Sequence, residues 1–124
     1  MVAADERTAE VAEKAGSFAE DTFPVAVRRV LAVHPDDETG RMLHAPGLRT
    51  AGRFYGFAAG TDLVVKLPEA RVAELVDSGL GLPCSPRPGR PMREWVQLPA
   101  PDLESCVAHL LEAREFVLGA AVPR

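Results

Sequence analysis

The chain has 124 residues, of which 47% are hydrophobic and 26% are charged, and its formal net charge is −4. This length favours a single domain, and the composition is typical of a globular protein rather than a disordered or membrane-spanning one. No apolar run approaches the ~18 residues of a transmembrane helix, and Asp5 and Glu6 stand where a signal peptide would be basic. We therefore expect a cytoplasmic protein without a membrane partner, in which Cys84 and Cys106 are reduced.

The first twenty residues differ from the rest of the chain in charge. They hold five acidic against two basic side chains, so most of the net charge of −4 belongs to them. Because alanine and glutamate favour helices, residues 5–19 are predicted to form a solvated helix. We divide the chain into an N-terminal helical extension, residues 1–20, and one folded domain, residues 21–124.

The folded domain begins with an apolar run over residues 24–34. Its large side chains recur at helical spacing, and Pro35 ends the pattern, which predicts a helix. The same run is rich in β-branched valine, so a strand is the alternative.

From residue 40 to residue 67 the pattern changes to short strands and tight turns. Strands are predicted at 41–48, 53–59 and 62–67. The turns Ala51-Gly52 and Gly60-Thr61 separate them, and glycine there permits the positive φ angles of hairpins. Because these connections are too short for parallel crossovers, the strands should form an antiparallel meander.

The remaining elements alternate between helix and strand. A helix is predicted from Pro68 to Gly79. The proline-rich stretch over 79–91 excludes a central strand but allows an edge strand and a hairpin loop. A strand at 93–98 and a helix from Asp102 to Gly119 complete the chain. This order predicts an α+β fold with two layers, in which helices flank an antiparallel sheet of about four to five strands.

Several of these segments together resemble a known family. They are Gly40-Arg41-Met42 with Ala45-Pro46-Gly47-Leu48, Phe54-Tyr55-Gly56-Phe57, Leu63-Val64-Val65-Lys66-Leu67-Pro68 and Met92-Arg93-Glu94-Trp95-Val96. In this pattern of strands, turns and one tryptophan, the chain resembles the TfoX N-terminal domain family over roughly residues 24–118. Such domains open TfoX/Sxy competence regulators, and their fold is similar to that of YjbR-like proteins. The resemblance implies a regulatory or interaction module that acts through contacts with a protein or a ligand, without enzymatic activity or a cofactor. We expect a protein partner or self-association. We carry over the fold and not the competence role.

A second resemblance competes with this interpretation. Residues 34–38 read His-Pro-Asp-Asp-Glu after an apolar run, like the motif of LmbE/PIG-L-type zinc de-N-acetylases. The resemblance implies that a strand delivers His34 and Asp37 to zinc and that Asp36 activates water. We favour a helix end followed by an acidic turn, because the other two histidines stand in no ligand cluster.

A third hypothesis concerns basic side chains in the predicted turns. If the two hairpin tips lie at one end of the sheet, these arginines form a patch for an anion or a nucleic acid. The alternative is a set of solvated surface arginines. The residues are Arg49, Arg53, Arg87, Arg90 and Arg93.

Overall fold

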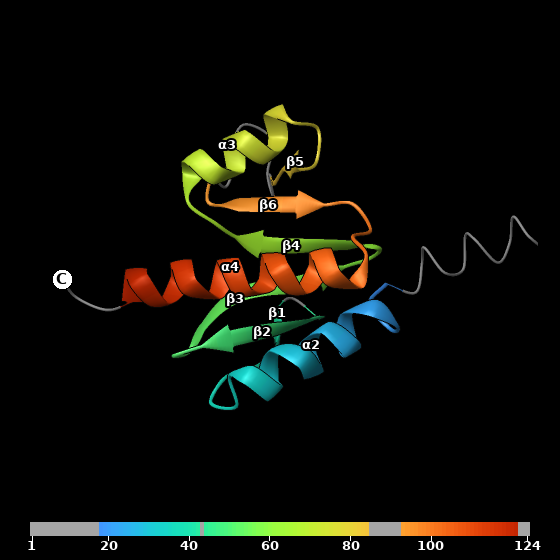
Figure 1. Ribbon diagram of the computed structural model, residues 1–124, viewed down its shortest axis with the longest axis vertical. Helices are drawn as coiled ribbons and strands as arrows, with labels where there is room; N and C mark the ends of the chain where they lie inside the picture. The colour runs from blue at the N-terminus through green and yellow to red at the C-terminus, as the bar shows by residue number, and fades with distance from the viewer. Residues whose placement is uncertain (1–17, 43, 85–92, 122–124) are drawn as a thin grey trace, which may run out of the picture.

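The computed structural model describes residues 18–42, 44–84 and 93–121. Within them, three helices and a six-stranded antiparallel sheet form the α+β domain that the sequence predicted (Figure 1). The sheet has one strand more than the upper end of the expected range. The helix expected over residues 5–19 lies outside the described residues, except for 18 and 19, which belong to a turn.

Every neighbouring pair of strands in the sheet is antiparallel, in the order β1-β2-β3-β4-β6-β5. Helices α2 and α4 lie side by side over one face, and α3 lies beside β5 and β6 (Figure 1). In chain order the elements are α2 (Thr22–Val33), β1 (Glu38–Met42), β2 (Ala45–Thr50), β3 (Arg53–Ala59), β4 (Asp62–Lys66), α3 (Glu69–Asp77), β5 (Leu82–Pro83), β6 (Trp95–Leu98) and α4 (Leu103–Ala121). None of the described helices is long and apolar enough to span a membrane.

The predicted strand at 41–48 is wrong, because two strands and a turn occupy this part of the chain. Strand β1 ends at Met42, which pairs with Ala45 at the start of β2, so the chain reverses between them. His44 has a φ of 75°, a conformation that usually selects glycine. No glycine marks this turn, so the expected three-stranded meander has four strands.

The predicted helix ends are confirmed in two places and wrong in one. Helix α3 follows Pro68, and Gly79 just beyond it has a φ of 84°. At the start of α4, the backbone N–H of Ser105 donates to Oδ1 of Asp102 at 2.8 Å, which is the expected cap. Gly119 does not end α4, which continues to Ala121. Glycine disfavours a helix by about 1 kcal/mol without preventing one.

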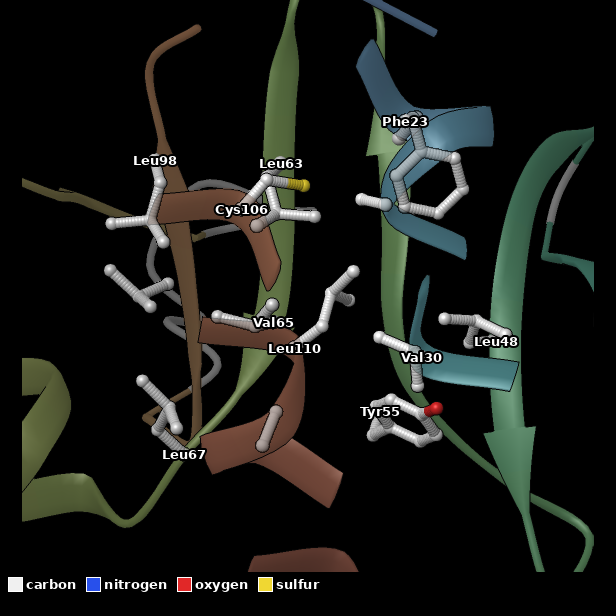
Figure 2. Close-up of a cluster of buried hydrophobic side chains, with 14 of the residues drawn as sticks. Phe23, Val30, Leu48, Tyr55, Leu63, Val65, Leu67, Leu98, Cys106 and Leu110 are labelled. Carbon is white, nitrogen blue, oxygen red and sulfur yellow. The ribbon is translucent and has the colours of Figure 1, made fainter. Parts of the chain in front are cut away.

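The core lies between the sheet and helices α2 and α4. In Figure 2, Leu110 of α4 lies toward the middle of the cluster. Before α2, the ring of Phe18 packs against that of Phe23 with centroids 6.1 Å apart. The helices bury Phe23, Ala26, Val30, Cys106, Leu110, Ala113 and Val117, at spacings of three and four residues.

A smaller cluster lies on the opposite face of the sheet. Val65 and Val96 belong to the core, so Val64 and Trp95, their neighbours in sequence, point the other way. The Trp95 ring contacts that of Phe57 with centroids 5.6 Å apart. Trp95, the one tryptophan of the chain, is thus 9% exposed and packs outside the main core.

Candidate functional site

Asp37 and Thr50 are the buried polar residues in the described part of the chain. Oδ2 of Asp37 accepts a hydrogen bond from the Tyr55 hydroxyl at 2.8 Å and another from Nε of Arg114 at 2.7 Å. Thr50 also donates a side-chain hydrogen bond to this carboxylate. We call these four residues the Asp37 cluster.

The backbone positions Asp37 and Tyr55 in different ways. After α2, the His34 N–H donates to the carbonyl of Val30, and the Asp37 N–H then donates to the carbonyl of His34 at 3.1 Å. This turn points the Asp37 carboxylate inward. Tyr55 is the extra residue of a β-bulge, since Leu48 pairs with Gly56 while the next residue of β2 pairs with Phe54. A bulge redirects a side chain, and here it turns Tyr55 into the core.

The electrostatics of the Asp37 cluster oppose acid–base catalysis. Burial alone would raise the pKa of Asp37, but hydrogen bonds from Arg114, Thr50 and Tyr55 and the charge of Arg114 hold it below its usual 3.8. Burial and the neighbouring carboxylate of Asp37 raise the pKa of Tyr55. The carboxylate therefore stays ionised and the phenol stays neutral near pH 7. A general acid or base works best with a pKa near the working pH. The hydrogen bonds of the cluster join the α2–β1 turn to β2, β3 and α4.

The zinc-like segment follows a helix and not a strand. Helix α2 ends at Val33 with His34 as its C-cap, as the favoured interpretation predicted. Asp36 is exposed, whereas Asp37 points into the core. Of the two predicted zinc ligands, Asp37 already contacts the guanidinium of Arg114, whose Nε lies 2.7 Å from Oδ2 of the carboxylate. No three metal-ligating side chains gather within the described residues.

The predicted basic patch is only partly within the described structure, since Arg87 and Arg90 lie outside it. Arg49, Arg53 and Arg93 lie near one end of the sheet, because β2 and β4 end where β3 and β6 begin. Two of them face carboxylates. Arg49 lies 3.7 Å from Glu38, and Arg93 lies 3.8 Å from Glu69.

The two cysteines are free and weakly acidic. Burial and the charge of Asp102 raise the pKa of Cys106 to about 12. Burial also raises the pKa of the half-buried Cys84. Because the thiolate is the nucleophile, neither thiol has the lowered pKa typical of a reactive cysteine.

A groove between α2 and the β1–β2 edge is a feature that the sequence analysis missed. Its volume is about 380 Å³. The wall formed by α2 includes Pro24, Val27, Arg28 and Leu31, at helical spacing next to the stripe that faces the core. Gly40 and Gly47 pair with each other and contribute backbone to the floor. We call this feature the α2–β1 groove.

The α2–β1 groove had a weak signal in the sequence. Val27 and Leu31 belong to the apolar helical pattern of residues 24–34, but in the structure they form a second stripe that is only partly buried. The sequence shows which residues form the apolar face of a helix. It does not show how far a neighbouring strand extends beyond that helix.

Comparison with known proteins gives this chain no relative from which to transfer a function. No protein-family model, no curated protein and no solved structure matches it.

Proposed function

We propose that this chain is a non-enzymatic binding module that acts through contacts with another protein. Its resemblance to the TfoX N-terminal domain family implies such a role. The observation that carries the proposal is the α2–β1 groove, an open apolar surface beside the edge strand β1. Partly apolar grooves of this size are typical of binding sites.

The state of the ionisable side chains supports a binding role over a catalytic one. The buried carboxylate of Asp37 is occupied by Arg114 and Tyr55, and its pKa is lowered. The pKa values of both cysteines are raised, which disfavours nucleophilic catalysis. The zinc hydrolase hypothesis is the less favoured alternative, because Asp37, one of its two ligands, already accepts hydrogen bonds from Arg114 and Tyr55.

The loop arginines give a weaker basis for function. Glu38 and Glu69 oppose Arg49 and Arg93, so two of the three described cations are partly neutralised. Phosphate-dominated binding depends on uncompensated positive charge. A protein partner at the α2–β1 groove is therefore the function that the described geometry supports best.

Turnover assays test the non-enzymatic part of this proposal. The purified chain is incubated with chromogenic esters, phosphate esters and N-acetylated sugars, with and without added Zn²⁺. We expect no turnover above that of a buffer control. Turnover that disappears in Asp36→Asn or His34→Ala, while both variants keep the wild-type melting temperature, would overturn the proposal in favour of a hydrolase.

A further inference from the structure

We propose that β1 accepts an extended segment of a partner protein as an additional strand. The segment places an apolar side chain in the α2–β1 groove and an acidic side chain, two residues away, opposite Arg41. This inference rests on the proposed binding function and names the class of ligand.

The outer edge of β1 is suited to strand addition. Within the described residues, β1 is an outermost strand of the sheet and pairs only with β2. Its five residues, Glu38–Met42, include no proline. An edge strand exposes unpaired backbone N–H and C=O groups that can pair with another extended chain. The opposite edge is less suited, because β5 has two residues and one of them is Pro83.

The register of β1 determines which side chains an added strand would meet. Thr39 pairs with Leu48, which belongs to the core beneath the helices. Paired residues in an antiparallel sheet point to the same face, so Thr39 and Arg41 both project on the helix-covered face. A residue opposite Thr39 would point toward the groove wall formed by Val27 and Leu31.

The positive charge around the α2–β1 groove favours an acidic residue in the ligand. Arg28 forms part of the α2 wall, and Arg41 projects on the same face of the adjacent strand. Both side chains are exposed, and within the described structure neither forms an ion pair. Arg41 donates one hydrogen bond, from Nη1 to the carbonyl of His44 at 3.1 Å. A carboxylate opposite Arg41 would therefore add a charge-assisted hydrogen bond without displacing an internal partner.

A second copy of this chain fits the groove less well than such a segment. If two β1 strands paired antiparallel with their helix-covered faces on the same side, Thr39 and Arg41 of one copy would oppose the same two residues of the other. The groove would then receive no large apolar side chain, and two guanidinium groups would approach Arg28. The apolar wall and the unpaired cations together favour a different partner.

Peptide selection provides the probe. Random peptides of about ten residues, long enough for one strand, are displayed on phage and selected against the full chain. Enriched sequences are synthesised with a fluorophore and titrated. We expect them to share a large apolar residue and an acidic residue two positions apart. Failure to enrich any peptide above selection on the bare support would overturn the inference.

Two variants locate the binding surface. Val27→Glu places a charge in the groove and should weaken binding about tenfold or more. Val33→Glu makes the same change on the same helix, outside the groove and at a side chain that is 66% exposed, and should leave the affinity unchanged. Melting temperatures show whether each variant is folded. Equal affinities for both folded variants would contradict the proposed site.

A charge exchange tests the pairing with Arg41 without disturbing the core. Arg41→Glu should weaken binding of the selected peptides, and replacing their acidic residue by lysine should restore it. N-methylation of alternate peptide amides should abolish binding in one register and preserve it in the other, because only one set of N–H groups faces β1. An affinity that stays the same after all of these changes would refute the β1 site and would leave a binding function at another surface.

Measurements of molecular mass in solution distinguish a separate partner from a second copy of this chain. A concentration-dependent dimer of the free chain that the selected peptides dissociate would overturn the inference in favour of self-association at β1. The turnover assays test the proposed function separately, since hydrolysis does not depend on whether a peptide binds at this edge.

Discussion

The carboxylate of Asp37 is a charge in the core that three elements hold in place. Its side chain is 1% exposed and that of Arg114 is 12% exposed, so water screens their interaction weakly. The two residues are 77 positions apart in the sequence. No local pattern connects them, so the sequence offered Asp37 only as a candidate zinc ligand or part of an acidic turn and did not indicate Arg114 as its partner.

Removing either member of this ion pair should destabilise the fold. We expect Asp37→Ala and Arg114→Ala each to lower the free energy of unfolding by about 3 kcal/mol or more, because each leaves an uncompensated buried charge. The double variant should lose less than the sum of the two. Urea denaturation measures all three values. Additive losses would show that the two side chains do not stabilise each other.

The lowered pKa of Asp37 also predicts a pH dependence. The folded chain binds this proton more weakly than the unfolded chain, whose Asp pKa is about 3.9. The contribution to stability is therefore complete above that value and is lost as the pH falls through the lower pKa of the folded state. The free energy of unfolding should fall less steeply below pH ~5 in Asp37→Asn than in the wild type. Asp36→Asn, at an exposed neighbour, is the control and should keep the wild-type slope.

At the scale of elements, glycine residues predicted some of the turns, whereas a turn that lacks glycine was not predicted. The Ala51-Gly52 turn joins β2 to β3 where the sequence placed it, and both residues have positive φ angles, 51° and 78°. The turn at His44 has no glycine, so the sequence pattern predicts one strand over 41–48 where the structure has parts of β1 and β2. A positive φ is only a preference of glycine, so a pattern based on glycine misses turns in which another residue adopts it.

Opposite substitutions in the Ala51-Gly52 turn should have opposite effects. Ala51→Gly should raise the free energy of unfolding by about 0.5–1 kcal/mol, because alanine is strained at positive φ. Gly52→Ala should lower it by about 1–2 kcal/mol for the same reason. A Cβ at Gly52 would meet nothing within 4 Å, so crowding does not contribute. Thermal and urea denaturation measure both changes, and two changes of the same sign would contradict the backbone explanation.

At the scale of the whole molecule, α2 and α4 cover one face of the sheet, while α3 lies beside the edge formed by β6 and β5 (Figure 1). Helix α4 buries a stripe that runs from Cys106 to Val117, whereas α3 buries only Val72 and Leu75. A side-chain contact joins α3 to α4, because Nε of Arg71 donates to Oε2 of Glu112 at 2.8 Å. In this arrangement, α3 has a smaller buried surface than α4.

Native-state hydrogen exchange should separate these two helices. We expect the amides of α3 to exchange through local opening at a lower free energy than the central amides of α4, because α3 has fewer buried contacts. Arg71→Ala should lower the protection of α3 further, by at most about 1 kcal/mol for a partly exposed ion pair. Equal free energies in α3 and α4 would instead indicate that the domain opens as one cooperative unit.

The length and composition of the sequence favoured one globular domain, and apolar spacing with turn and cap residues predicted an α+β fold with most of its elements. These features depend on neighbours within a few residues, which a single sequence displays directly. Only the tertiary structure paired Asp37 with Arg114, redirected Tyr55 through a bulge and left the α2–β1 groove open beside an edge strand. Each of these features depends on how segments far apart in the sequence pack against one another. Local periodicity does not indicate which distant segments come into contact.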